Sequence, residues 1–254
     1  GANGKRIVNM NQPIGNPTLD LTTFDDYQYH ENDLINIAHL GRQWFGESFD
    51  INQEQEFDFN FPNIDPSSPI TIKVVAASAA YTTTSFQVNS NSQNIGNINF
   101  PAINTNSDTA FFVRNLSSTN TVSSSDNIKI KLSYNNNGVP GSKGYLDNIA
   151  LFAKRKLIGF GKQFHFQYNL SNTESGIATY NFTNANGITQ VWDITDLFNV
   201  TKLENKDQNA FSFKAKLGET RKYIAIDAVD YYTPLKDPKS KITNQNIKGT
   251  IFRN

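Results

Sequence analysis

The chain has 254 residues, enough for one large or two ordinary β domains, since domains usually hold roughly 100–150 residues. It contains no cysteine, which excludes disulfides, thiolate nucleophiles and cysteine-ligated metals. The 23 basic and 23 acidic residues cancel, and no apolar run reaches the roughly 18 residues that a membrane-spanning helix needs, so no membrane span is expected.

The charges are unevenly distributed along the chain. Residues 1–70 carry three bases and eleven acids, so this part has a charge of −8 and the remainder +8. Opposed fields favour docking of the N-terminal segment on the rest and leave a basic surface for an anionic partner. Lysines that only keep β edges from pairing with other chains are the alternative explanation.

Short alternating runs, broken by Asn, Ser, Gly and Pro, recur along the chain. The 19 Phe and 10 Tyr, with abundant Thr, Val and Ile, suit the pleated, half-buried surface of a sheet. The predicted fold class is all-β: a jelly-roll-like β-sandwich followed by a second, smaller β-sandwich-like domain. The expected divisions are 1–49, an N-terminal arm and docking segment; 50–156, the jelly-roll-like sandwich; and 157–254, the second β domain with a basic C-terminal tail.

Residues 1–23 are polar and rich in Asn, Gly and Pro, which predicts a loose arm or an added edge strand. The apolar residues of 34–40 could form two helical turns, with Asn32 or Asp33 as the N-cap and Gly41 as the stop. A strand is the competing prediction for the same residues.

From Glu56 the alternation becomes clear, because Phe57, Phe59 and Phe61 all point to one face of a strand. Further strands are expected over Ile70–Ala76, Ser85–Val88, Ile95–Phe100, Ala110–Arg114, Ile128–Tyr134 and Tyr145–Ala153. The bases of 154–156, followed by Gly159 and Gly161, mark the boundary to the second β set.

The second set is expected to contain Gln163–Tyr168, Ala178–Phe182, Ile188–Ile194, Ala210–Lys216 and Arg221–Asp227. Leu217–Thr220 would be the hairpin turn between the last two. The Lys- and Pro-rich tail 233–248 is expected to lie over the surface. Because no signal peptide precedes the folded part and residues 249–252 resemble a strand at the very end, we expect a chain truncated at both ends.

Histidine is the usual acid, base or metal ligand, and the sequence has His30, His39 and His165. Their spacing matches no HExxH or other metal motif, so structural or exposed roles are favoured. His165 lies between Phe164 and Phe166, and alternation should turn it to the face opposite those rings.

Paired carboxylates are the next candidates for chemistry. Glu54, Glu56 and Asp58 are spaced by two, so they should share one solvated strand face and repel one another. Asp193 and Asp196 flank a strand end, where turn bonding explains them better than catalysis. Asp147 with Asn148 would be the ligands of a calcium ion, but the dense oxygen ligands of a calcium loop are missing. The sequence therefore predicts no catalytic, cofactor-binding or metal site.

Two binding functions remain to be considered. A basic stripe interleaved with aromatic residues would suit nucleic acid, but Arg221, Lys222, Tyr223, Tyr231 and Tyr232 straddle an acidic stretch, so no nucleic-acid partner is expected. A carbohydrate-binding or adhesive β-sandwich would use exposed aromatic residues, with Trp44, Tyr81 and Tyr134 as candidates.

Four segments in the same order resemble the N-terminal region of the type nine secretion system sortases, which are gingipain-like cysteine peptidases of the bacterial cell surface. The segments are Gly41–Phe49 (GRQWFGESF), Gly144–Phe152 (GYLDNIALF) with the following Lys154–Leu157, Val191–Asp196 (VWDITD) and Tyr223–Asp227 (YIAID). The resemblance runs from about Phe24 to the end of the chain and fails before it.

The resemblance implies an exported protein, at the outer-membrane surface or in the periplasm of a Gram-negative bacterium. In that family a downstream cysteine and histidine process secreted cargo and attach it to anionic lipopolysaccharide. No residue here matches those catalytic motifs, so this chain would be a non-catalytic scaffold or interaction region. Its implied partners are a catalytic domain further along the same parent chain, other secretion-system surface proteins or cargo, and anionic lipopolysaccharide.

Overall fold

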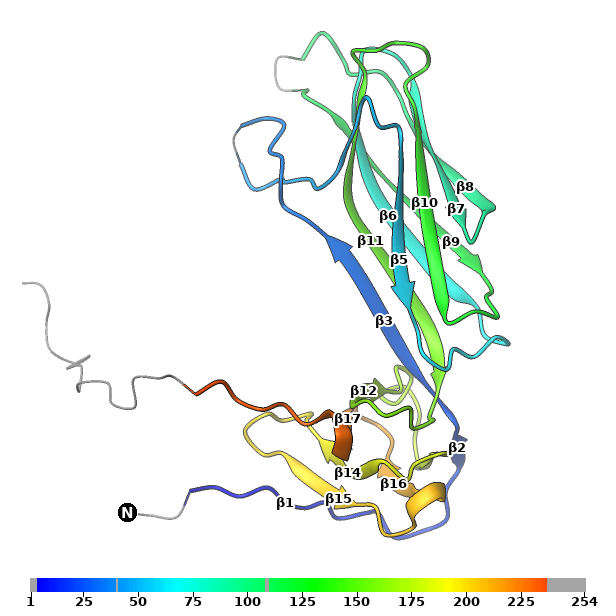
Figure 1. Ribbon diagram of the computed structural model, residues 1–254, viewed down its shortest axis with the longest axis vertical. Helices are drawn as coiled ribbons and strands as arrows, with labels where there is room; N and C mark the ends of the chain where they lie inside the picture. Colours follow the sequence, from blue (N-terminus) through cyan, green and yellow to red (C-terminus); the bar gives the residue numbers. More distant parts are fainter. Residues whose placement is uncertain (1–3, 40, 108–109, 237–254) are drawn as a thin grey trace, which may run out of the picture.

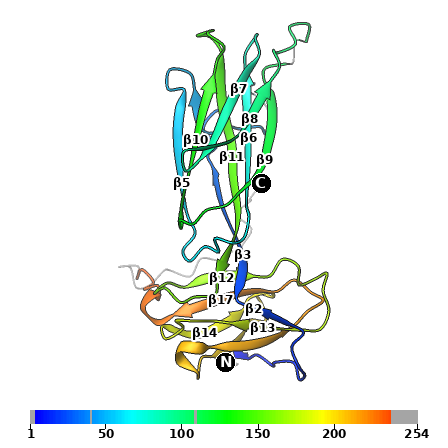
Figure 2. The same ribbon diagram turned by 90° about the vertical axis from the view of Figure 1, so that its right-hand side faces the viewer.

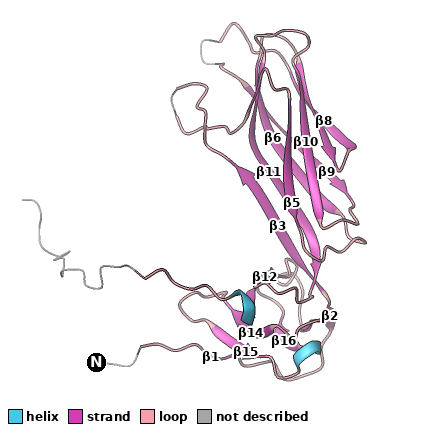
Figure 3. Ribbon diagram, viewed as in Figure 1, coloured by secondary structure: helices cyan, strands magenta, loops and turns pink. Residues whose placement is uncertain are grey.

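The computed structural model describes residues 4–39, 41–107 and 110–236, and it forms two β lobes stacked along the long axis (Figures 1 and 2). Apart from the short 3₁₀ helices η1 (Gln208–Ala210) and η2 (Ala228–Asp230), all regular structure in these residues is strand (Figure 3). The all-β, sandwich-like fold class predicted from the sequence is confirmed.

The first lobe is a sandwich of two four-stranded layers. One layer has the order β5 (Glu54–Asn60), β10 (Asn127–Asn135), β7 (Thr84–Ser90) and β8 (Gln93–Phe100). The facing layer has the order β3 (Thr23–Glu31), β11 (Lys143–Lys156), β6 (Ile70–Ala79) and β9 (Val113–Thr121), with β4 (Ser48–Phe49) also paired to β11. Apart from the β7–β8 hairpin, consecutive strands from β5 to β11 alternate between the two layers, as in a jelly roll.

The second lobe is smaller and has an aromatic core. Its larger layer has the order β1 (Val8–Asn9), β15 (Thr201–Glu204), β14 (Ile188–Asp193), β17 (Lys222–Asp227) and β12 (Phe164–Gln167). A second sheet contains β16 (Ser212–Lys216), β13 (Ile177–Asn181) and β2 (Leu19–Leu21). Phe166 lies at the centre of the core, with its ring centroid 5.2 Å from that of Tyr223 and 5.3 Å from that of Phe182.

One ten-stranded sheet runs through both lobes, because β12 pairs with β3 through Gln167 and Asp25. The two lobes nevertheless have separate apolar clusters, one built mainly from β5 to β11 and one from β12 to β17 with Leu21 and Phe24. Residues before 50 thus contribute strands to both lobes. The domain divisions at 49/50 and 156/157 remain predictions.

Most predicted strands are confirmed, including the alternation that buries Phe57, Phe59 and Phe61. The N-terminal 23 residues do supply added strands, since β1 pairs in parallel with β15 and β2 pairs in parallel with β13. The first 70 residues also dock through charge, since Asp25, Asp26, Asp50, Glu54 and Glu56 pair with bases between residues 129 and 155.

The alternative of a helix over 34–40 is wrong for the described residues 34–39. Ile35 instead forms an isolated antiparallel bridge with Phe45, with both backbone N–H···O distances at 2.8 Å. Ile35 and Ile37 also pack around the buried Phe45. Tertiary pairing overrides the short helical pattern here.

Two other element predictions need correction. The strand expected over Ala110–Arg114 begins at Val113 and continues to Thr121, because β9 follows β6 in register through its Ser, Thr and Asn residues. Leu217–Thr220 is not a hairpin turn, since β16 and β17 belong to different sheets. The positions predicted for Leu40, for 237–248 of the tail and for the terminal strand 249–252 lie outside the described residues.

Candidate interaction surface

The three histidines lie on separate segments of the described chain. His30 Nε2 is 3.0 Å from Glu47 Oε1, and the His30 ring centroid is 4.8 Å from that of Phe57, so His30 packs against β5 of the facing layer. His39 is exposed with a positive φ of 53°. His165 is exposed while Phe164 and Phe166 are buried, as alternation predicts.

The carboxylates of β5 share one exposed face, as predicted, but repulsion is not their main relation. Lys129 Nζ is 2.6 Å from Glu56 and Lys131 Nζ is 2.7 Å from Glu54, so the neighbouring strand β10 supplies opposite charges. This ladder of exposed pairs gives no acid–base machinery.

The turn prediction for Asp193 and Asp196 is confirmed. Asp193 accepts a hydrogen bond from the backbone N–H of Thr195 at 3.0 Å, and Asp196 accepts one from Phe198 at 2.9 Å. Asp193 also pairs with Arg221 at 2.8 Å. Both carboxylates are therefore committed to local structure.

The Asp147 carboxylate is already bound by side-chain donors rather than free to ligate calcium. Arg114 Nε and Gln43 Nε2 donate to Asp147 Oδ2 at 2.6 and 3.2 Å, and Asn148 Nδ2 donates to Oδ1 at 3.1 Å. Asp147 lies at a register shift in β11 that turns its side chain toward these donors. Over the described ranges, no group of three His, Asp or Glu side chains could hold a metal ion.

The aromatic candidates for sugar binding separate into two kinds. Trp44 and Tyr81 are 43% and 77% exposed. Tyr134 is buried, and its hydroxyl hydrogen-bonds with Ser78 at 2.9 Å, so its candidacy is wrong. Strand alternation decides the difference, since Tyr134 follows the inward positions of β10.

The basic and aromatic residues at the start of β17 and after its end do not form a stripe. Tyr223 is 1% exposed, and its burial raises the pKa of the phenol. Arg221 pairs with Asp193 and Glu219. Tyr231 and Tyr232 are exposed beyond the strand. None of the described helices has the length and apolar character of a membrane span.

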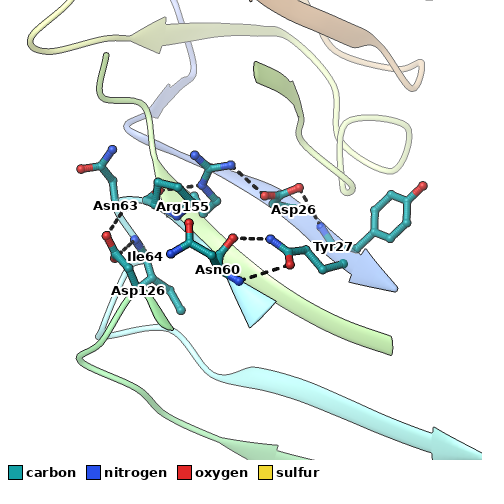
Figure 4. A network of polar contacts seen from close by, with 9 residues as sticks. Asp26, Tyr27, Asn60, Asn63, Ile64, Asp126 and Arg155 are labelled. Atoms are coloured by element: carbon teal, nitrogen blue, oxygen red, sulfur yellow. Dashed lines mark hydrogen bonds and ion pairs between the residues drawn. The ribbon is translucent and has the colours of Figure 1, made fainter. Parts of the chain in front are cut away.

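The contact between the lobes is built around Arg155, at the end of β11. Its guanidinium lies 5.1 Å from the ring centroid of Phe24, 5.3 Å from that of Phe160 and 5.6 Å from that of Phe164. Its Nε donates to the carbonyl of Pro62 at 2.7 Å, and its Nη1 donates to Asp26 Oδ2 at 2.9 Å (Figure 4).

A second ion pair lies beside the first. Lys154 Nζ is 2.8 Å from Asp25 Oδ1, while Asp25 Oδ2 accepts the backbone N–H of Asn169 at 2.8 Å. The loop carrying Asn169 belongs to the second lobe, so Asp25 joins both lobes. We call these two ion pairs, with the three rings around Arg155, the joint.

Beside the joint, three aromatic side chains are exposed on the outer face of β3 and β11 in the ten-stranded sheet. Tyr27 and Tyr29 on β3 are 65% and 50% exposed, and Phe152 on β11 is 40% exposed. Tyr27 stands opposite Phe152 in the register, with ring centroids 6.3 Å apart. In Figure 4, Tyr27 points away from the Asp26–Arg155 pair. Burial raises the pKa of Tyr29, with Glu31 adding to the shift, so its phenol is neutral at physiological pH.

Two hollows adjoin at this face. One of about 360 Å³ is lined by Tyr27, Tyr29 and Phe152 together with Gln167. The other, of about 490 Å³, continues past Gln167 to His165 and Lys222 on the second lobe. Both share Asp25, Asp26, Tyr27 and Gln167, so they form one trough across the joint. Aromatic-lined hollows of this size at a junction of lobes are common ligand and partner sites.

Comparison with known proteins supports the fold but assigns the chain to no family. No family model and no curated protein matches the sequence. The crystal structure of dimeric latent PorU from Porphyromonas gingivalis resembles this chain with a TM-score of 0.72 at 15% sequence identity, covering 87% of this chain and 22% of that chain. The carbohydrate-binding module CBM36 in complex with calcium and xylotriose covers 50% of this chain at a TM-score of 0.33, below the level of a shared fold.

The trough was not predicted from the sequence. The alternation of Tyr27 and Tyr29 in the run FDDYQYHE was the available signal, because it predicts two aromatic side chains on one face of a strand. What the sequence does not reveal is that β3 pairs with β11, which brings Phe152 beside Tyr27.

Proposed function

We propose that this chain is a non-catalytic β scaffold of a larger cell-surface cysteine peptidase similar to the type nine secretion system sortases. The observation that carries the proposal is the structural likeness to PorU over 87% of this chain. It agrees with the resemblance of the four sequence segments to the sortases. The chain spans only 22% of the PorU chain, which leaves room for a catalytic part elsewhere in such a protein.

The side chains support a scaffold role over a catalytic one. The sequence has no cysteine, and His30 is bonded to Glu47 with no serine or threonine hydroxyl among its hydrogen-bond partners. The candidate carboxylates Asp193, Asp196 and Asp147 are held by structural hydrogen bonds. In this proposal the parent protein is exported to the cell surface, and the scaffold positions the peptidase, its cargo or neighbouring secretion proteins, with anionic lipopolysaccharide as a further partner.

The test begins with the coding sequence of the gene downstream of the codon for residue 254. A gingipain-like domain with a cysteine and a histidine is expected there, and replacing that cysteine with alanine should abolish cargo processing by the parent protein. A gene that ends near this residue would refute the proposal, as would peptide turnover by the purified chain that is traceable to its own side chains.

A carbohydrate-binding or adhesive module is the second candidate. The exposure of Trp44 and Tyr81 favours it, since exposed aromatic rings can stack on sugar rings. A glycan array probed with the purified chain tests this function. Binding that is lost in Trp44→Ala or Tyr81→Ala is the expected result for such a module, and an array without hits removes it.

A further inference from the structure

The trough across the joint has an apolar end and a basic end. Tyr27, Tyr29 and Phe152 form the apolar end on the first lobe. At the other end, His165 and Lys222 are both exposed, and neither has a carboxylate partner in the part of the chain that the structure describes. A ligand that fits both ends therefore combines an apolar group with a negative charge.

The polar groups between the two ends are already occupied. Asp25 accepts from Lys154 and from the Asn169 N–H, and Asp26 accepts from Arg155 and from the Tyr27 N–H. Gln167 Nε2 donates to Asn169 at 2.6 Å. The free polar groups lie mainly at the two ends, where the Lys222 amine lacks a carboxylate partner among the described residues. This amine favours a ligand with a carboxylate, and a peptide can present a carboxylate together with an apolar side chain, whereas a neutral sugar offers neither.

The register gives the spacing that such a segment must have. Asp25, Gln167 and Lys222 are neighbours on three adjacent strands, and Tyr27 is two residues along β3 from Asp25. Strands lie about 4.8 Å apart and rise about 3.3 Å per residue, so Tyr27 and Lys222 are separated by ~12 Å. An extended peptide covers that distance in about four residues.

We propose that the trough is the docking site for an extended segment of the peptidase part of the parent protein. This segment places an apolar or aromatic side chain against Tyr27, Tyr29 and Phe152, and a carboxylate about four residues away beside Lys222 and His165. The inference rests on the proposed function and adds to it the surface and the chemistry of the contact.

Photocrosslinking in the full-length parent tests the docking. With p-benzoyl-phenylalanine introduced at Tyr29, irradiation should join the trough to a peptide from beyond residue 254 that has an apolar residue and an Asp or Glu about four residues apart. The same group introduced at the exposed Tyr81 is the control, and it should not capture that peptide.

A charge reversal tests the basic end. Lys222→Glu should lower the yield of this crosslink at least about fivefold, because it repels the segment's carboxylate. Lys216→Glu, which changes another exposed lysine on the other sheet of the second lobe, should leave the yield unchanged. Thermal melting of both variants checks that they are folded.

Three results would overturn the docking proposal: no crosslink beyond residue 254, capture of a glycan or a separate protein instead, or an equal yield in Lys222→Glu. These failures are distinct from failure of the proposed function. If the coding sequence contains a peptidase domain but the crosslink does not reach it, the scaffold proposal stands and only this contact is lost.

Discussion

Arg155 concentrates several interactions in one side chain. It is 6% exposed, and its guanidinium contacts three aromatic rings, a carbonyl oxygen and the Asp26 carboxylate. A planar cation that stacks and donates in fixed directions suits this position, whereas lysine offers only a point charge. The ion pair is shielded from solvent, so it should respond to truncation far more than a surface pair does.

Arg155→Ala is expected to lower the free energy of unfolding by about 2–4 kcal/mol, since it removes the donor to Asp26 Oδ2 and to the Pro62 carbonyl and takes the cation away from the rings. Lys129→Ala, which removes an exposed pair with Glu56, is the matched control and should not shift the denaturation midpoint. Chemical denaturation measures both. Equal stability of the two variants would show that Arg155 has no special role.

Tyr168 gives a prediction about alkaline pH. Burial, and then the hydrogen bond from its hydroxyl to Glu174 at 2.8 Å, raise its pKa to about 12. A raised pKa means that the neutral phenol stabilises the fold fully below pH ~10 and that this contribution is lost as the pH rises toward 12.

In Tyr168→Phe, unfolding at neutral pH should cost about 0.5–1.5 kcal/mol less, because the hydrogen bond is missing. The difference from the unmodified chain should shrink between pH 10 and 12, since only the unmodified chain has this phenol to ionise. Unfolding curves at several pH values provide the measurement. A constant difference across this range would contradict the assigned pKa shift.

At the scale of elements, the alternation of apolar and polar residues predicts which side chains of a strand face the core and which face solvent. The inward Phe57, Phe59 and Phe61 and the outward His165 were placed correctly because a strand has a strict period of two. Long-range pairing was beyond reach: β9 consists largely of Ser, Thr and Asn, yet it is a strand because β6 supplies its partner. The trough combines β3, β11, β12 and β17, whose adjacency no local pattern encodes.

Close packing between elements gives a third prediction, at Gly144 in β11. A Cβ built there would lie 2.6 Å from Phe86 Cζ and 2.7 Å from Tyr134 Cδ2, both on buried rings of the facing layer. Gly144→Ala should therefore destabilise the first lobe by about 1–3 kcal/mol. Gly141→Ala is the control, since nothing lies within 4 Å of its Cβ position. Thermal or urea unfolding compares them, and similar effects of the two changes would contradict the packing argument.

At the scale of the whole molecule, two kinds of contact hold the lobes together. Backbone pairing is slight, since among the described residues β12 pairs with β3 only through Gln167 and Asp25. The side chains of the joint supply the rest, with Arg155 and Lys154 on β11 reaching acids on β3 and groups of the second lobe. A trough that spans both lobes keeps its shape only while their relative orientation is fixed. The joint is therefore expected to set the geometry of the trough.

Spin labels can measure this orientation, and the chain suits the method because it has no cysteine of its own. Labels on cysteines introduced at the exposed Ser118 of β9 and Lys216 of β16 report the distance between the lobes. A narrow distribution is expected, because Arg155 is buried in the joint and its ion pair with Asp26 is little affected by salt. Arg155→Leu retains apolar contact with the rings but leaves Asp26 Oδ2 and the Pro62 carbonyl without the Arg155 donor, so the distribution should broaden while each lobe stays folded. An unchanged width would mean that the backbone pairing of β3 alone aligns the lobes, and that the trough does not depend on the joint.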